Sequence, residues 1–314
     1  MTTMTKTPGR WASLSKGQAF FIHLILSLLI FSTLVFVMLM WWFPGELFFL
    51  DGGWQGLKLV ALIDLVLGPA LTLLLYKPHK PKLLMDMSLI AGFQVAALAY
   101  GFYATHQQRT VAVVYADRNF TTLSAAALVK AEMELVGKER QPQSVTQLDN
   151  SKPAMMLTPE PGPGEFKAHM RELFDGFPEP HERLDLFVKR GPEHGEFLTE
   201  RAVTTDKLKI TGADVLMDEI ITKGDFDKDD IELHHFQARY AKGLVIFSKS
   251  EQKILDYVPI NWNELIDAKT AELNEQANTA EDNTDNDNIG KDNAIGTELN
   301  QATDENTLVE SVEE

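Results

Sequence analysis

One acidic side chain interrupts a long apolar segment, and it is the residue best suited to a specific interaction. Residues 57–76 read LKLVALIDLVLGPALTLLLY, with Asp64 near the middle and Gly68-Pro69 one turn later. A helix of 20 residues rises about 30 Å, which is enough to cross a bilayer. A carboxylate at the centre of the hydrocarbon costs about 2.5–3.5 kcal/mol on insertion scales. We therefore expect Asp64 to face protein or water rather than lipid.

Small residues accompany this acid on one side of the predicted helix. Ala61, Asp64, Gly68 and Thr72 follow i, i+3, i+7, i+11 spacing, which places them on one face. Small side chains let another helix approach closely, and Pro69 leaves a carbonyl acceptor that a neighbour must satisfy. We interpret the segment as the packing centre of a small membrane bundle. The alternative is a single lipid-facing anchor helix that tolerates its Asp.

Motifs that would indicate enzymatic chemistry are missing from the sequence. It contains no G-x-G-x-x-G, Walker loop, G-x-S-x-G or H-E-x-x-H motif, and no cysteine for thiolate catalysis or Cys-based metal sites. The acidic run 225–230 has Asp230 and Phe236 where a calcium loop needs Gly and Glu. Glu165 and His169 have the spacing of a ligand pair but lack a third partner. We expect no enzyme activity, no cofactor and no metal site.

The negative charge of the chain is concentrated at its C-terminal end. The formal charge is −16 over 314 residues, and residues 271–314 carry thirteen Asp or Glu and one Lys, a net −12. The remaining positions therefore carry only −4, which is not the basic footprint that nucleic-acid binding requires. Asn, Asp, Glu and Thr dominate this tail, so it cannot bury enough apolar area to become ordered.

Three apolar runs, 19–43, 57–76 and 83–103, predict three transmembrane helices. The first is too long for the apolar core of a signal peptide and ends in Trp41-Trp42-Phe43-Pro44 rather than at a small-residue cleavage site. Three basic residues precede the first run and three lie in the loop 77–82, whereas only Lys58 lies near the intervening turn. The positive-inside rule then places the N-terminus in the cytoplasm and everything after residue 106 outside.

The predicted topology also predicts a contact between helices. Asp64 lies twelve residues from the inner end of its helix and Gln94 lies eleven from the inner end of the third, so both side chains reach the same depth. We predict a hydrogen bond between them, with Gln94, Ala97 and Gly101 on one face of the third helix.

Two further intramembrane features leave alternatives open. A second small-residue stripe on the third helix includes Ser88 and Gly92, and it is available to the first helix, which we take as the default, or to a foreign helix. Asp86 and His23 lie near the cytoplasmic boundary, where each reaches headgroup water or the two pair with one another.

The remainder of the chain predicts a small α+β domain. We expect strands at 110–116, 183–189, 234–240, 244–248 and 253–258, helices at 124–139, 165–174 and 214–222, and an irregular connection at 140–164. The predicted organisation is a cytoplasmic N-terminus at 1–18, a three-helix transmembrane region at 19–105, an extracytoplasmic α+β domain at 106–266 and a disordered acidic tail at 267–314.

A series of short motifs runs through the membrane region. They are Trp42-Phe43-Pro44-Gly45-Glu46-Leu47-Phe48, Gly52-Gly53, Ile63-Asp64-Leu65-Val66-Leu67-Gly68-Pro69, Lys80-Pro81, Asp86, Gln94 and Tyr100-Gly101. With these motifs the chain resembles the TfpX/TfpZ family of type IV pilin accessory proteins, strongly over 40–120 and more thinly to about 262. The resemblance implies a multi-pass protein of the bacterial inner membrane, with a periplasmic domain, that helps the major pilin reach assembled surface fibres. It implies no catalytic residues.

We therefore expect a non-enzymatic accessory factor for type IV pilus biogenesis that assists pilin stability, assembly or surface presentation. Its expected partners are the major type IV pilin, the lipid bilayer and other pilus assembly proteins. The residues expected to pack helices or contact a partner in the membrane are Asp64, Gly68, Pro69, Thr72, Asp86, Gly92, Gln94 and Gly101. The alternative is a membrane-anchored periplasmic enzyme or sensor domain, which would need a polar pocket outside or an output domain inside.

Overall fold

The computed structural model describes residues 14–78, 83–141, 153–189 and 194–282. The chain divides into two compact units. The first unit holds the residues up to 190 together with Gln237–Ala241, and the second holds Gly191–Phe236 and the residues from 242 onward. We describe each unit by itself.

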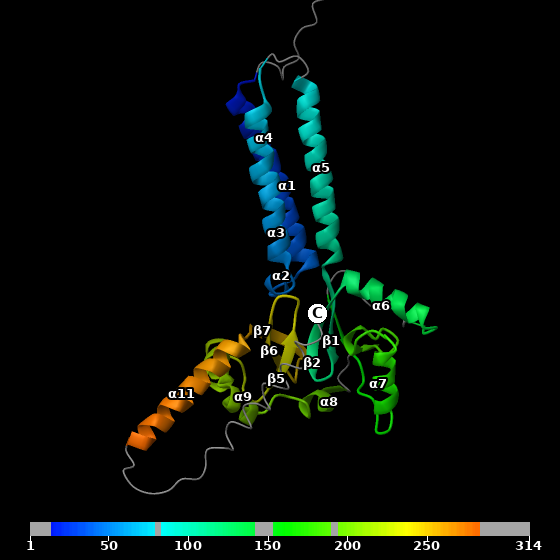
Figure 1. Cartoon of the computed structure of the whole chain (residues 1–314), viewed down its shortest axis with the longest axis vertical. Helices are drawn as coiled ribbons and strands as arrows, with labels where there is room; N and C mark the ends of the chain where they lie inside the picture. Colours follow the sequence, from blue (N-terminus) through cyan, green and yellow to red (C-terminus); the bar gives the residue numbers. More distant parts are fainter. Residues whose placement is uncertain (1–13, 79–82, 142–152, 190–193, 283–314) are drawn as a thin grey trace, which may run out of the picture. The chain divides into compact units, whose positions relative to one another are not determined.

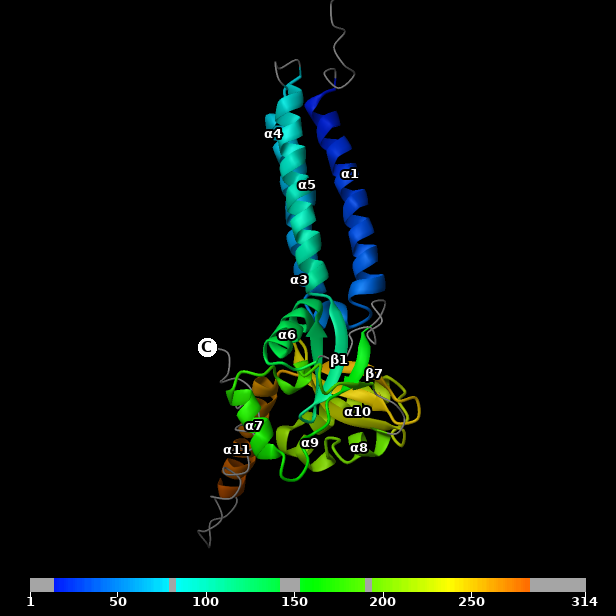
Figure 2. The same cartoon turned by 90° about the vertical axis from the view of Figure 1, so that its right-hand side faces the viewer.

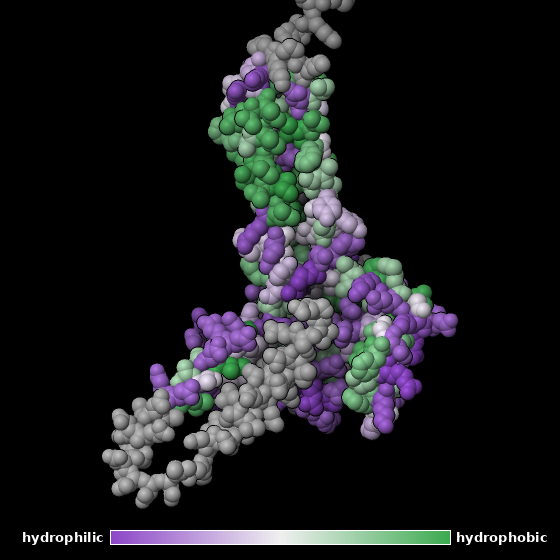
Figure 3. Space-filling model, viewed as in Figure 1, coloured by the Kyte–Doolittle hydropathy of each residue, from purple (hydrophilic) through white to green (hydrophobic). Residues whose placement is uncertain are grey.

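Three helices of the first unit are long and apolar enough to cross a membrane, so the chain is a multi-pass membrane protein (Figure 1). The first span is α1 (Lys16–Val37), which continues into the π-helical turn η2 (Met38–Trp42). The second consists of α3 (Gly53–Ala61), the π-helical turn η3 (Leu62–Leu67) and α4 (Gly68–Leu75). The third is α5 (Leu83–Gln107). Hydrophobic side chains form a continuous surface over these helices (Figure 3).

Local sequence explains how the spans begin and are connected. Ser15 and Gln18 form a capping box at the start of α1, which satisfies two backbone N–H groups that the helix leaves unpaired. A short helix, α2 (Leu47–Leu50), lies in the connection between the first two spans. Aromatic residues close this end of the bundle, where the Trp42 ring meets Phe102 at 4.7 Å between ring centroids. The three predicted spans are confirmed.

The first unit continues from α5 into a four-stranded sheet of order β4-β3-β1-β2. β1 (Thr110–Ala116) and β2 (Asn119–Ser124) form an antiparallel hairpin, and β3 (Ala154–Leu157) runs parallel to β1. β4 (Val188–Lys189) is antiparallel to β3. The turn of the hairpin consists of Asp117 and Arg118, both with positive φ, which matches the twist of a two-residue hairpin.

Three helical elements complete the first unit. They are α6 (Ala125–Gly137), α7 (Phe166–Phe174) and the 3-10 turn η5 (Pro180–Glu182). The Ser124 hydroxyl accepts a hydrogen bond from the Ala127 N–H and so caps α6. The helix then packs Leu128 and Leu135 against Val114 of the sheet in an apolar core.

The second unit packs helices on one face of a small sheet. Its helices are α8 (Gly195–Thr199), α9 (Thr205–Thr211), α10 (Ala213–Lys223) and α11 (Trp262–Asp282). Its strands are β5 (Ile231–Gln237), whose last residue belongs to the first unit, β6 (Lys242–Ser248) and β7 (Lys253–Pro259), in the order β5-β6-β7. Met217, Leu244 and Ile246 lie in its core. Both units mix helices with strands, as predicted.

The structure corrects three expectations. Residues 183–189 do not form a strand, because Arg183 turns inward to bind two acids and only Val188–Lys189 pairs with the sheet. The stretch expected to be irregular contains β3, which the parallel pairing with β1 holds. The acidic tail does not lose structure at 267, because α11 continues to Asp282. Trp262 and Leu265 anchor the start of that helix on the second core, and its Ala, Glu and Gln residues favour helix. Residues 283–314 lie outside the described residues.

Candidate functional site

The second span widens into a π-helical turn directly before Pro69. Proline has no N–H and its ring clashes with the preceding turn of an α-helix. The Gly68 N–H bonds the Ile63 carbonyl across the wider turn, and the Thr72 hydroxyl donates to the Gly68 carbonyl at 3.1 Å. This local adjustment lets the helix continue through Pro69 and directs Asp64 into the bundle, where it is 1% exposed.

All three spans contribute to the surroundings of Asp64. Ser27 Oγ of α1 donates to Asp64 Oδ1 at 3.1 Å, and Gln94 Nε2 of α5 donates to the same oxygen at 3.0 Å. The structure thus contains the predicted bond between Gln94 and Asp64. Gly68 is required for it, because a Cβ at this position would overlap the Gln94 amide. Ser27 was missed, since a serine in an apolar run has no pattern that distinguishes it.

A second polar contact lies closer to the end of the bundle at which α1 begins and α4 ends. His23 Nδ1 is 2.6 Å from Thr72 Oγ1, and the Tyr76 hydroxyl donates to the Leu14 carbonyl at 3.2 Å. His23 of α1 therefore contacts the second span through Thr72, while Asp86, the acid considered for it, lies half-buried on α5.

The two small-residue faces of α5 differ in their surroundings. Gly101 faces α3, where an added Cβ would meet Val60 at 3.4 Å, so it lies on the same packed side as Gln94. Gly92 is exposed, and a Cβ there would meet no atom of the described residues within 4 Å. The expectation that α1 covers the Gly92 stripe is wrong, because α1 packs along α4 and η3 instead.

α1 and α5 run side by side along the bundle (Figure 2). Side chains of both helices line a groove. It has a volume of about 580 Å³, within the usual range of ligand sites. Its walls are the apolar side chains of the two helices, among them Leu26, Ile30, Ile90, Val95 and Leu98. The polar residues Asp64, Ser27, Gln94, His23 and Thr72 also line it. Asp64 Oδ2 is buried and has no hydrogen-bond partner among the described residues.

A second buried acid attaches the helices to the sheet of the same unit. Asp51, in the connection after α2, is 4% exposed and accepts from the hydroxyls of Thr110 on β1 and Thr122 on β2, the latter at 2.7 Å. The Arg239 N–H also donates to Asp51 Oδ1 at 3.1 Å, and the neighbouring Tyr240 N–H donates to the Leu50 carbonyl at 2.9 Å.

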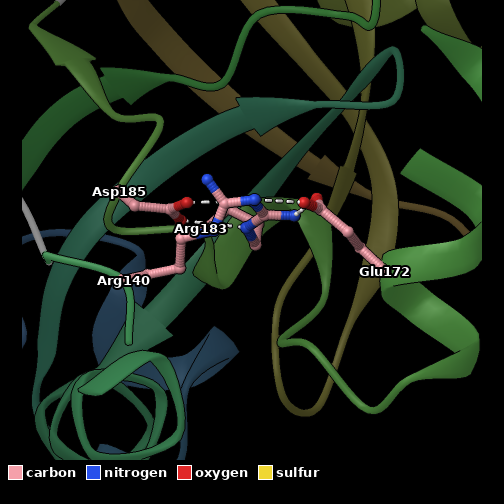
Figure 4. Close-up of polar contacts among 4 residues, drawn as sticks. All are labelled: Arg140, Glu172, Arg183 and Asp185. Atoms are coloured by element: carbon pink, nitrogen blue, oxygen red, sulfur yellow. Dashed lines mark hydrogen bonds and ion pairs between the residues drawn. The ribbon is translucent and has the colours of Figure 1, made fainter. Parts of the chain in front are cut away.

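The outer part of the first unit contains a buried arginine cluster (Figure 4). Arg183 is 2% exposed, and its Nε and Nη2 donate to the two oxygens of Asp185 at 2.9 Å each. Its Nη1 donates to Glu172 of α7 at 2.9 Å, and Arg140 binds the same carboxylate. The hydrogen bonds that Arg183 donates to Asp185 raise the pKa of the Arg183 guanidinium above its usual value. The cluster fixes α7 beside the η5 turn and is saturated by its own partners, so we assign it a structural role.

Metal-binding candidates from the sequence do not assemble in the described residues. These contain no group of three His, Asp or Glu side chains placed to hold an ion. Asp230 instead accepts from the Ser248 hydroxyl at 2.5 Å and from the Ser250 N–H at 2.8 Å, so the acidic run 225–230 stabilises the turn between β6 and β7.

These features define a class: a multi-pass membrane protein with a polar, three-helix contact at mid-membrane and attached α+β units.

Comparison with known proteins gives the family. The chain is 32% identical over 114 residues to the fimbrial assembly protein of serogroups C1 and C2 of Dichelobacter nodosus, covering 36% of this chain and 87% of the relative. It is also 32% identical to the serogroup I fimbrial assembly protein of that organism, of which the match covers 44%. The chain belongs to the family of these fimbrial assembly proteins. No protein-family model matches it, and no solved structure does.

Proposed function

We propose that this protein is a non-enzymatic accessory factor for type IV pilus biogenesis, and that its partner is the major pilin. The family relationship supports a role in fimbrial assembly. The membrane motifs that resemble type IV pilin accessory proteins support the narrower assignment. In this proposal the protein lies in the bacterial inner membrane with its N-terminus in the cytoplasm and its α+β units in the periplasm.

The observation that carries the proposal is the groove between α1 and α5. Its walls are apolar, and Asp64, Ser27 and Gln94 in its lining lie near the middle of the spans, which suits a surface for a membrane-inserted subunit. The first unit also carries a compact sheet attached to the helices through Asp51. A pilin subunit held both in the bilayer and outside it would gain avidity, because the first contact raises the effective concentration at the second.

Affinity capture from mildly solubilised membranes tests this proposal. We expect the major pilin to be captured with the wild-type chain and to be strongly reduced with Gly68→Leu, whose side chain displaces Gln94. Gly137→Leu is the matched control, because it adds the same side chain to a glycine with free space around it, outside the groove and the membrane spans. Failure of wild-type chain to capture pilin would refute the assignment.

The orientation is tested separately. A reporter that fluoresces only in the cytosol, fused after residue 314, should stay dark, whereas the same reporter fused before residue 1 should fluoresce. The opposite pattern would refute the periplasmic placement of the α+β units.

A further inference from the structure

The Asp64 carboxylate is only half satisfied. Oδ1 accepts two hydrogen bonds, from Ser27 and Gln94, whereas Oδ2 has no partner among the described residues. A buried polar atom without a hydrogen bond is costly, and most costly far from water. Asp64 lies eleven residues from both ends of its span, Gly53 and Leu75, or about 16 Å along the helix from either end. A donor from outside the described residues that reaches this depth would satisfy Oδ2.

The groove is the route by which such a donor can reach Asp64. Asp64 lines it together with Ser27 and Gln94, and the apolar side chains of α1 and α5 form its walls. Apart from His23, Thr72 and Tyr76, the rest of the lining is apolar, as expected of a surface that receives a membrane-inserted segment rather than a soluble ligand.

We propose that the groove between α1 and α5 binds a transmembrane helix of the fimbrial subunit, and that this helix carries an N–H or O–H donor in the middle of its apolar segment that bonds Asp64. The inference rests on the proposed function for the identity of the subunit. It adds the chemical feature that the groove selects, which is one polar donor at mid-membrane depth on an otherwise apolar helix.

Two other occupants fit the observations less well. A lipid acyl chain would fill the apolar walls but has no donor, so Asp64 Oδ2 would stay unsatisfied. A second copy of this chain would present the lipid-facing sides of its spans, where Leu29, Val66 and Phe93 are exposed near the same depth and have no donor. Its exposed hydroxyls on α1, Ser32 and Thr33, lie five and six residues beyond Ser27, or about 7–9 Å along the helix from the level of Asp64.

Single cysteines allow the occupant to be identified, because the chain contains none of its own. Leu26→Cys and Val95→Cys place a benzophenone maleimide in the groove, whereas Leu29→Cys and Phe93→Cys place it on exposed sides that do not line it. After illumination of intact membranes, we expect adducts with the fimbrial subunit from the first pair only. Adducts with lipid, with a second copy or with another protein would overturn the inference.

Asp64→Asn tests the donor. Asn keeps an oxygen for Ser27 and Gln94 but replaces Oδ2 with an NH₂ group, which meets the partner's donor with another donor. When the amount of fimbrial subunit is limiting, we expect the yield of the Leu26→Cys adduct to fall about three- to twentyfold. This is the range that corresponds to the loss of one intramembrane hydrogen bond. An unchanged adduct would overturn the role of Asp64.

A second variant keeps the test valid if Asp64→Asn folds poorly. Ile30→Trp fills the groove from the α1 wall and keeps Ser27, Asp64 and Gln94 themselves unchanged, and Leu29→Trp is its control on the exposed side. With the crosslinker attached at Val95→Cys, we expect the Ile30→Trp variant to lose the adduct with the fimbrial subunit and the Leu29→Trp variant to retain it. The number of surface fimbriae on a strain that lacks this protein distinguishes failure of this inference from failure of the proposed function. Fimbriae lost on deletion with no groove adduct would refute the inference alone, and fimbriae unaffected by deletion would refute the proposed function.

Discussion

Asp51→Ala should loosen the attachment between the membrane helices and the sheet of the first unit. Asp51 accepts from Thr110, Thr122 and the Arg239 N–H, and it is almost fully buried. Hydrogen bonds to a charged group contribute about 1.5–3 kcal/mol each, but bonds that share one acceptor are not additive. We expect a loss of about 3–5 kcal/mol of local stability, because three donors are left unpaired at once.

Hydrogen exchange on the full chain in detergent measures this loss. A change of 1.4 kcal/mol corresponds to tenfold, so peptides that contain the Arg239 amide should exchange at least about a hundredfold faster. Asp51→Asn should cost much less, because its oxygen still accepts from Thr122 and Arg239 and its amide can donate to the Thr110 hydroxyl. Glu46→Ala, an exposed acid in the same connection, should change nothing. Exchange in Asp51→Ala within threefold of wild type would refute the reasoning.

Three further predictions concern the first unit. Burial lowers the pKa of His181 to about 4, so the unfolded state binds more protons between pH 6.5 and 4. Stability should therefore fall by at most about 3 kcal/mol as the pH decreases through this window. Burial of Glu182 raises the pKa of its carboxyl and opposes part of this slope, so comparison of thermal midpoints with His181→Gln isolates the histidine. Arg183→Leu removes the guanidinium that binds Asp185, while Glu172 keeps its contact with Arg140, and should cost about 3–5 kcal/mol in denaturant unfolding. Gly52→Ala should lower the thermal midpoint, because Gly52 has φ of +94° and a Cβ would overlap Tyr240.

The membrane part of the fold was predictable because its rules are local. Length and hydropathy define each span, and counting residues from the helix ends was enough to bring Gln94 opposite Asp64. The rotation of α1 was not predictable, because its apolar residues surround the helix and give no preferred face. The groove and the contribution of Ser27 depend on that rotation, so neither could be derived beforehand.

The contacts outside the spans depend on long-range pairing. Asp51 meets partners 59, 71 and 188 positions away, and no short motif marks them. β3 has only four residues and gains its conformation from the parallel register with β1. The long hairpin strands β6 and β7 were predicted nearly to their ends, since their turn and their β-branched residues lie close together in the sequence.

Two attachments join the helices to the sheet of the first unit, and together they resist rotation. α5 ends at Gln107 and β1 begins at Thr110, so one linkage is covalent and very short. Asp51 supplies the other from the connection between the first two spans. A sheet attached at one point can rotate about that point in any direction, whereas a sheet attached at two points can rotate only about the line that joins them. A sideways displacement of the second span at mid-membrane would therefore tilt the β1–β2 hairpin.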